Sequence, residues 1–130
     1  RVFDPSGSWV WLDDESQMDA VTALSGSGPA YFFLLAECMA DAGVQLGLPL
    51  DTARRLAVAT LHGAGLMAGT ALQTSGADGA AEAADPWSMP RMRAEVTSKG
   101  GTTAAAVGQL EAARLRDLVL AAMRAAKKAA

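Results

Sequence analysis

The sequence has 130 residues and a formal net charge of −3; 51% of its residues are hydrophobic and 5% are aromatic. A chain of this length forms one domain at most, and its scattered Lys and Arg residues lack the basic stripe of a nucleic-acid-binding protein. The longest unbroken apolar run, residues 29–36, is far shorter than the roughly 18–20 residues that a membrane span requires. We therefore expect neither a nucleic-acid nor a membrane partner, and we find no signal peptide.

The first predicted element is a short strand at residues 9–12, which follows turn residues at 5–8. No other segment is predicted to be a strand, and a lone strand leaves its backbone N–H and C=O groups unpaired. This strand is therefore expected to belong to a sheet outside the sequence or to pair with another chain. Residues 13–16 then offer capping side chains for a short helix over residues 17–24.

A Gly/Ser turn is predicted next, at Ser25-Gly26-Ser27-Gly28-Pro29. Glycine frees the backbone to turn, and proline suits the first turn of a helix. The N–H groups exposed at such a helix start, together with the helix dipole, can bind a small anion.

The following helix is predicted over residues 29–46, ending at Gly47 with a proline beyond it. Its few polar residues, Glu37, Asp41 and Gln45, recur every fourth position and form one narrow strip. A helix that is apolar nearly all round must be buried nearly all round, and a domain this small has little capacity to enclose one. We expect a second subunit to cover it.

Neither the one cysteine nor the one histidine is assigned a role. Cys38 cannot form an internal disulfide, which fits a cytoplasmic location. We interpret it as a buried side chain rather than a nucleophile, because no histidine lies near it in the sequence. His62 has no second candidate ligand, and no cluster of Cys, His and carboxylate residues has the spacing of a metal site.

A helix is predicted over residues 52–72, capped by Asp51, with small residues that recur every fourth position (Thr60, Ala64, Ala68; Gly65, Gly69). Glycine inside a soluble helix costs up to about 1 kcal/mol relative to alanine, so we expect another helix to approach closely; a merely weak helix is the alternative. An exposed loop at residues 74–85 and a short helix at residues 88–95 follow.

The most informative stretch is Ser98-Lys99-Gly100-Gly101-Thr102-Thr103, which we call the glycine loop. Its two glycines permit a turn, and its two threonines begin a helix that ends near residues 108–111. Backbone N–H groups and hydroxyls at such a helix start can hold a carboxylate without supplying a strong acid or base. An ordinary structural turn is the alternative.

The last predicted helix carries an apolar stripe at i, i+3, i+4, i+7, i+8 and i+11: Leu115, Leu118, Val119, Ala122, Met123 and Ala126. Basic residues gather at its C-terminal end, where the helix dipole favours cations.

Familiar catalytic and nucleotide-binding motifs are missing from the sequence. There is no G-x-S-x-G elbow. The glycines of the glycine loop follow its lysine, so it is not a Walker A loop. Residues 26–28 lack the third glycine and the preceding strand of a dinucleotide fingerprint.

Two of these segments resemble a known family. Residues 19–31, D-A-V-T-A-L-S-G-S-G-P-A-Y, are similar to the segment that opens the C-terminal domain of pyrroline-5-carboxylate reductase. Residues 96–103, V-T-S-K-G-G-T-T, with G-Q-L-E at 108–111, resemble the signature of that family. The resemblance extends from about residue 7 to the C-terminus, although the connection at residues 74–90 looks longer than is usual in the family.

The resemblance implies an all-α, interlocking dimerisation domain that also carries much of the substrate site. Members of the family reduce 1-pyrroline-5-carboxylate to L-proline, the last step of proline biosynthesis, with hydride from NADPH or NADH held by an N-terminal Rossmann domain. Residues 1–14 would then be a linker and a strand remnant of that missing domain, and residues 15–130 the helical domain. A homodimer or a larger homo-oligomer is expected, and this fragment alone is expected to be inactive.

The resemblance also implies roles for individual residues. The glycine loop would grip the substrate carboxylate, with Ser98, Gly101 and Thr102 as its contacts and Gly100 as part of the same turn. Thr103 would hydrogen-bond the ring nitrogen and is the candidate catalytic residue. The segment Ser25-Gly26-Ser27-Gly28-Pro29 would lie near the nicotinamide end of the cofactor. Two alternatives stay open: a non-catalytic helical dimerisation module, and the C-terminal domain of a related imino-acid or β-hydroxyacid dehydrogenase.

Overall fold

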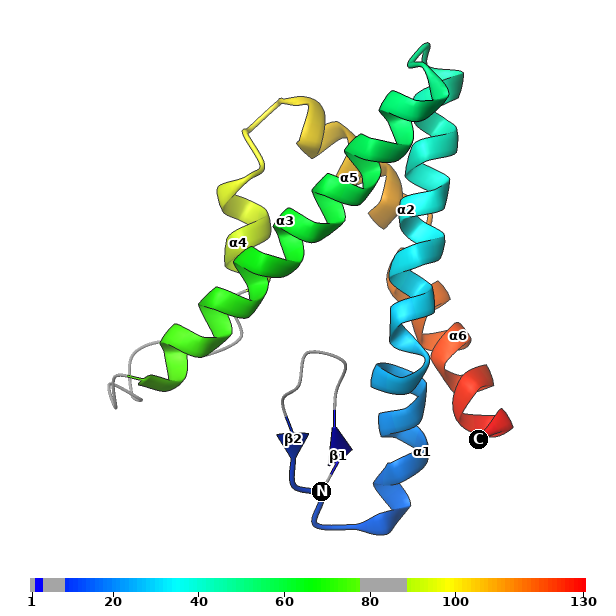
Figure 1. The fold of residues 1–130 in the computed structure, drawn as a ribbon, viewed down its shortest axis with the longest axis vertical. Helices are drawn as coiled ribbons and strands as arrows, with labels where there is room; N and C mark the ends of the chain where they lie inside the picture. Colours follow the sequence, from blue (N-terminus) through cyan, green and yellow to red (C-terminus); the bar gives the residue numbers. More distant parts are fainter. Residues whose placement is uncertain (1, 4–8, 78–88) are drawn as a thin grey trace.

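The computed structural model describes residues 2–3, 9–77 and 89–130, which are mainly helical (Figure 1). This confirms the predicted all-α class. The elements in chain order are β1 (Val2–Phe3), β2 (Trp9–Val10), the 3₁₀ turn η1 (Glu15–Gln17), α1 (Met18–Val21), the π-helical turn η2 (Thr22–Gly26), α2 (Gly28–Gln45), α3 (Leu50–Ala77), α4 (Met89–Glu95), α5 (Thr102–Ala112) and α6 (Leu115–Ala129).

The predicted N-terminal strand exists, but it does not stand alone. β2 pairs with β1 in antiparallel register, with Val2 opposite Val10 and Phe3 opposite Trp9. The expectation of a lone strand over residues 9–12 was therefore wrong, since the strand spans only Trp9–Val10 and β1 supplies a partner; that the strand is a remnant of a larger sheet stays a prediction. A two-residue strand is too short to produce an alternating pattern, and for this reason β1 was missed.

The first helical segment begins at a side-chain cap, as predicted. One carboxylate oxygen of Asp14 accepts a hydrogen bond from the backbone N–H of Ser16 at 2.9 Å, and the other accepts one from its hydroxyl at 2.7 Å. These two bonds lower the pKa of Asp14, because both stabilise the ionised carboxylate. The segment continues through α1 and η2 to Gly26, two residues beyond the predicted end.

Helices α2 and α3 form a hairpin whose arms diverge from a tight turn (Figure 1). The turn closes α2 with two hydrogen bonds of 3.0 Å, one from the Gly47 N–H to the Val44 carbonyl and one from the Leu48 N–H to the Gly43 carbonyl. This is the Schellman arrangement. Gly47 has φ +105°, a conformation that costs little only for glycine, so the predicted stop at Gly47 is confirmed.

The contact between α2 and α3 is made by very small residues. Ala40, Ala53 and Ala57 are buried, and a Cβ atom placed on Gly43 would lie 3.3 Å from the Cβ of Ala53. The two helices can meet closely at this point because neither carries a bulky side chain there. No large side chain is fully buried among the described residues.

Helix α3 differs from its prediction at both ends. It begins at Leu50, so Asp51 lies in the first turn rather than at the cap, and its carboxylate pairs with Arg55 at 2.8 Å. It ends at Ala77, so the predicted end at residue 72 and the start of the predicted loop were wrong, while residues 78–85 of that loop lie outside the described residues.

The glycines of α3 do not meet another helix within the described chain. A Cβ atom placed on Gly65 or Gly69 would find no atom within 4 Å. The spacing of these glycines predicts that another helix approaches α3 closely, but no helix among the described residues does so at Gly65 or Gly69.

The C-terminal half is held by α6, which contacts η2, α1 and α5. α5 and α6 are joined at Arg114, which has φ 62°. The carboxylate of Glu111 accepts two hydrogen bonds of 3.0 Å from Nε of Arg116 across this turn. In the predicted apolar stripe of α6, Met123 is half-buried, whereas Leu118 remains 65% exposed.

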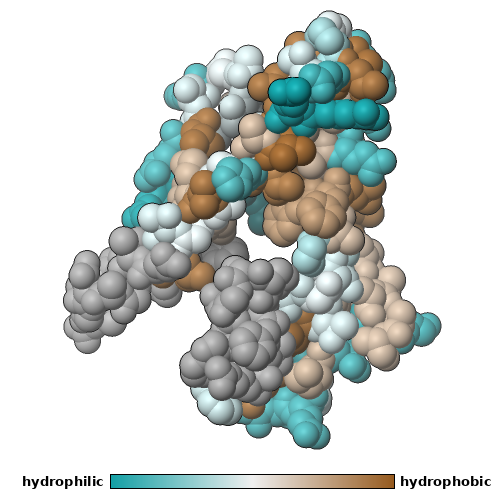
Figure 2. All heavy atoms as spheres, viewed as in Figure 1, coloured by the Kyte–Doolittle hydropathy of each residue, from teal (hydrophilic) through white to brown (hydrophobic). Residues whose placement is uncertain are grey.

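The chain leaves an unusually large surface open. It exposes 10360 Å² at a mass of 13.3 kDa, whereas a compact monomer of that mass exposes about 6,450 Å². Large apolar side chains of α2 contribute to this open surface: Phe32, Phe33 and Leu34 are each at least 59% exposed. Figure 2 shows hydrophobic residues open on the surface where α2 and α3 meet. The expectation that this chain alone cannot bury α2 is confirmed.

Cys38 is exposed in the chain, so its interpretation as a buried side chain was wrong for the single copy. It lies on the same helix whose apolar face remains open. Within the residues that the structure describes, no helix is both long and apolar enough to cross a membrane.

Candidate functional site

The glycine loop forms a tight turn between α4 and α5. The Gly101 N–H donates to the Ser98 carbonyl at 3.0 Å, which closes the turn around Lys99 and Gly100. Gly100 has φ +72°, as the third residue of a type II turn does, so the predicted turn is present and its glycine is required by the backbone.

The second glycine, Gly101, is required for a different reason: there is little room for a side chain beside it. Gly101 has an extended backbone (φ −88°, ψ −178°) that any residue can adopt. A Cβ atom at this position would, however, lie 3.3 Å from both the Cβ atom and the carbonyl oxygen of Ser98. The predicted flexibility therefore applies to Gly100, whereas Gly101 is fixed by the close approach of Ser98.

Helix α5 starts directly after this turn and leaves donors free. Gly101 is its N-cap and offers no side-chain cap, and the first helical hydrogen bond is the one from the Ala105 N–H to the Gly101 carbonyl at 3.1 Å. The N–H groups of the first turn, including those of Thr102 and Thr103, have no carbonyl partner within the helix. Together with the positive end of the dipole they suit a carboxylate.

The side chains of the loop differ in exposure. Ser98, Lys99 and Thr102 are exposed, whereas Thr103 is half-buried. A half-buried threonine at a helix start has a more restricted side chain than an exposed one, which suits a directed hydrogen bond from its hydroxyl. At the α4 end the loop is tied down by Thr97, whose hydroxyl donates to the Arg93 carbonyl at 2.5 Å.

The predicted Gly/Ser turn at residues 25–29 is instead the junction of two helical elements: Ser25 and Gly26 end the π-helical turn η2, and Gly28 and Pro29 begin α2 after Ser27. We call residues 25–29 the π-helical segment. The Ser27 N–H donates to the Thr22 carbonyl at 2.8 Å, five residues before it, and the Ser25 hydroxyl donates to the Val21 carbonyl at 3.0 Å. Proline has no N–H, and Gly28 is buried. The predicted turn is therefore absent and the Ser27 N–H is already used, while the role of residues 25–29 in cofactor binding stays a prediction.

The glycine loop and the segment at residues 25–29, which were both predicted to contribute to the site, are not brought together within one chain. η2 contacts α1, α2 and α6, whereas α5 packs against α6. Figure 1 shows the loop that precedes α5 and the segment between α1 and α2 well apart in the view. A single site that uses both groups therefore requires a second copy of the chain.

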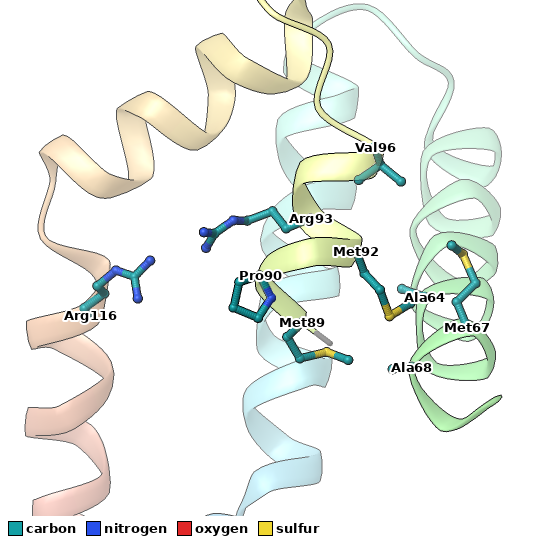
Figure 3. Close-up of a pocket in the computed structure, with 9 residues that line it drawn as sticks. All are labelled: Ala64, Met67, Ala68, Met89, Pro90, Met92, Arg93, Val96 and Arg116. Atoms are coloured by element: carbon teal, nitrogen blue, oxygen red, sulfur yellow. The ribbon is translucent and has the colours of Figure 1, made fainter. Parts of the chain in front are cut away.

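A separate groove of about 500 Å³ lies between α3, α4 and the start of α6. Met67 of α3 and Met89 and Met92 of α4 line its apolar part (Figure 3). Arg93 and Arg116 lie on its other side, and Arg116 is already paired with Glu111. None of these residues was predicted to be functional, because methionines spaced along a helix are ordinarily core residues.

The electrostatic perturbations lie away from the glycine loop. Hydrogen bonding by Arg116 lowers the pKa of Glu111, and the same bonds raise the pKa of Arg116. Among the described residues, no group of three or more His, Cys, Asp or Glu side chains could hold a metal ion. The glycine loop itself offers backbone N–H groups and hydroxyls, which can bind and orient a carboxylate.

A family model described as pyrroline-5-carboxylate reductase dimerisation matches residues 15–130 of the chain. A pyrroline-5-carboxylate reductase of Pseudomonas aeruginosa is 46% identical over 128 residues, which are 98% of this chain and 42% of that protein. A reductase of the same name from Mycobacterium tuberculosis is 47% identical over 129 residues, which are 97% of this chain and 43% of that protein. The chain thus spans about two-fifths of the length of these curated relatives.

Solved structures agree with the fold. A pyrroline-5-carboxylate reductase of Coxiella burnetii superposes with a TM-score of 0.75 at 38% identity, covering 92% of this chain and 39% of that one. The crystal structure of a Plasmodium falciparum pyrroline carboxylate reductase with NADP bound gives a TM-score of 0.71 at 28% identity, covering 95% of this chain and 42% of that one.

Proposed function

The chain belongs to the pyrroline-5-carboxylate reductase dimerisation family, and from this premise we propose that it is the helical, substrate-binding part of an oxidoreductase. The complete enzyme reduces 1-pyrroline-5-carboxylate to L-proline with NADPH or NADH, in the cytoplasm. The observation that carries the proposal is the glycine loop, whose turn leaves the α5 helix start open to a carboxylate in a chain of this family.

The residues of the loop would bind and orient the substrate. The N–H groups at the start of α5 and the hydroxyls of Ser98 and Thr102 hold its carboxylate. The half-buried hydroxyl of Thr103 meets the ring nitrogen. An imine carbon beside a protonated nitrogen accepts hydride readily, so alignment of donor and acceptor supplies much of the rate, and such alignment can contribute several kcal/mol. No histidine or cysteine is needed.

The cofactor supplies the hydride when it is bound. The π-helical segment suits its neutral nicotinamide end rather than its phosphates, because Ser27 has already used its N–H and Pro29 has none to offer. The small, uncharged residues Ser25, Gly26 and Gly28 leave room for a planar ring to approach. The phosphates would bind in a different domain of the complete enzyme.

The enzyme works as a homo-oligomer in this proposal. Homo-oligomerisation is supported by the dimerisation family and by the open apolar face of α2. A second copy would also bring the glycine loop of one subunit towards the π-helical segment of another. This arrangement explains why one chain holds the two groups apart.

The proposal predicts that Thr103→Ala in the complete enzyme lowers kcat/KM for imine reduction by about tenfold, the effect of losing one hydrogen bond to the reacting ring. Cofactor affinity should hardly change, because the hydroxyl meets the substrate. Steady-state kinetics with each substrate varied in turn measure both quantities. Thr103→Ser, which keeps the hydroxyl, is the control and should retain most of the activity.

The separation of the two groups in one chain favours, as the second candidate, a dimerisation module whose loops are only turns. Titration with L-proline, followed by NMR shifts of the amides at residues 98–103, distinguishes the two. Specific shifts there support the enzyme. A dimer with reductase activity absent and no shifts at these amides would establish the module instead.

A further inference from the structure

We propose that Tyr31 is a positioning residue for the cofactor: its hydroxyl holds the π-helical turn η2 in the shape that presents residues 25–28 to the nicotinamide. The inference rests on the proposed function for the identity of the ligand. Its structural basis is a single short hydrogen bond, in which the Tyr31 hydroxyl donates to the Ala23 carbonyl at 2.6 Å.

The π-helical turn has a cause in the sequence. In a continuous α-helix the Ser25 carbonyl would accept from the N–H of residue 29, but Pro29 has no N–H and its ring crowds the carbonyl four residues back. The helix instead widens by one residue, and the Ser27 N–H donates to the Thr22 carbonyl at 2.8 Å. Widened turns of this kind occur often at functional sites.

The widening deprives the Ala23 carbonyl of its usual partner. That carbonyl lies four residues before Ser27, whose N–H is used for Thr22 instead. Ala23 is 2% exposed, so water has little access to the group. A buried backbone carbonyl without a donor costs about 1–3 kcal/mol. The half-buried Tyr31, one helical turn into α2, supplies the donor from its side chain.

The bond therefore joins the two sides of the segment that carries Ser25, Gly26, Ser27 and Gly28. One end of the bond is on η2 before these residues, and the other is on α2 after them. Any change in the η2 geometry alters the direction in which the segment faces. Tyr31 contacts neither substrate nor hydride in this proposal, and it acts through the turn.

The test is Tyr31→Phe in the complete enzyme. Amide hydrogen exchange at residues 23–28 should become at least several-fold faster, and the Kd and KM for NADPH should rise about fivefold to tenfold, the range of one lost hydrogen bond. The KM for the imine should stay within about twofold, because the glycine loop is untouched. Thr60→Val is the matched control, since it removes a hydroxyl that donates to the Leu56 carbonyl at 2.7 Å in α3.

Unchanged exchange at residues 23–28 in Tyr31→Phe would overturn the proposal, as would faster exchange without any change in the NADPH constants. If that variant does not fold, Pro29→Ala tests the same geometry: the restored N–H lets the turn relax to an α-helix, and NADPH affinity should fall while the protein stays folded. Wild-type protein that binds no NADPH and reduces no imine would instead refute the proposed function, and the exchange data would still report on the turn.

Discussion

At the residue scale, the two glycines of the glycine loop are needed for different physical reasons. Gly100 has a left-handed φ of +72°, whereas Gly101 is confined by the Cβ atom and the carbonyl of Ser98 at 3.3 Å. The sequence alone predicts that both permit a turn. It does not show that Gly100 is needed for its backbone conformation and Gly101 for the space beside it, because the second requirement depends on where Ser98 lies.

We expect Gly100→Ala and Gly101→Ala to impair substrate binding by different routes. An L-residue in the left-handed region costs roughly 1–2 kcal/mol, so Gly100→Ala should lower the free energy of unfolding by about that amount or let the turn rearrange. Gly101→Ala should displace Ser98 by a few tenths of an ångström and raise the KM for the imine with a smaller loss of stability.

Gly108→Ala is the control for both variants. It lies in α5, where an added Cβ atom would meet nothing within 4 Å, and replacing a helical glycine should stabilise by up to about 1 kcal/mol. Thermal unfolding and steady-state kinetics measure the three variants. Equal behaviour of Gly100→Ala and Gly108→Ala would show that the loop does not need the left-handed residue.

At the element scale, the sequence predicts the existence of the helices better than their ends. Gly47 stops α2 as expected, because its left-handed conformation favours glycine. Helix α3 runs five residues past its predicted end, since Thr74, Ser75 and Gly76 have a loop-like composition that did not prevent helix formation. The π-helical turn was missed because Pro29 is typical of an ordinary helix start, and the bond from Tyr31 to the Ala23 carbonyl, eight residues away, is visible only in the structure.

The link between α5 and α6 should depend on pH. Hydrogen bonds from Arg116 lower the pKa of Glu111 in the folded chain, with Arg93 adding to the effect. A carboxyl whose pKa is depressed on folding adds stability above its unfolded pKa and loses it as the pH falls through its folded pKa. The contribution should therefore be complete at neutral pH and disappear in acid.

An NMR titration of the Glu111 side chain should give a midpoint below that of an ordinary glutamate. Arg116→Gln should return it to the ordinary range. Arg91→Gln, which removes the guanidinium 3.6 Å from Glu95, should leave the Glu111 midpoint where it was. If the Glu111 midpoint is the same in Arg116→Gln as in the wild type, the hydrogen bond between these two residues is not populated in solution.

At the scale of the whole molecule, the single chain leaves many of its large apolar side chains uncovered. Its open surface exceeds that of a compact monomer by about 3,900 Å², which is more than the roughly 1,000–2,500 Å² that each subunit of an obligate homodimer commonly buries. The sequence predicts from α2 alone that one chain cannot cover its apolar surface. It does not predict that the glycine loop and residues 25–29 lie apart within one chain, because that placement depends on how the helices pack.

We expect Phe33→Glu to weaken the oligomer. Phe33 is 66% exposed in the single chain and lies on the apolar surface of α2, so burial at an interface would leave an unpaired charge there at a cost of several kcal/mol. Sedimentation over a dilution series should show dissociation at higher concentration than for the wild type. Lys128→Glu, at the exposed C-terminal end of α6, should dissociate like the wild type; equal behaviour of both variants would place Phe33 outside the interface.

The alanine contact between α2 and α3 has a consequence for the cell. With only small side chains enclosed, a newly made chain gains most of its stability when it meets another copy, so folding and encounter become one second-order process. The amount of folded protein should then rise more steeply than the amount of polypeptide when expression is low. Halving the gene dose would remove more than half of the folded protein.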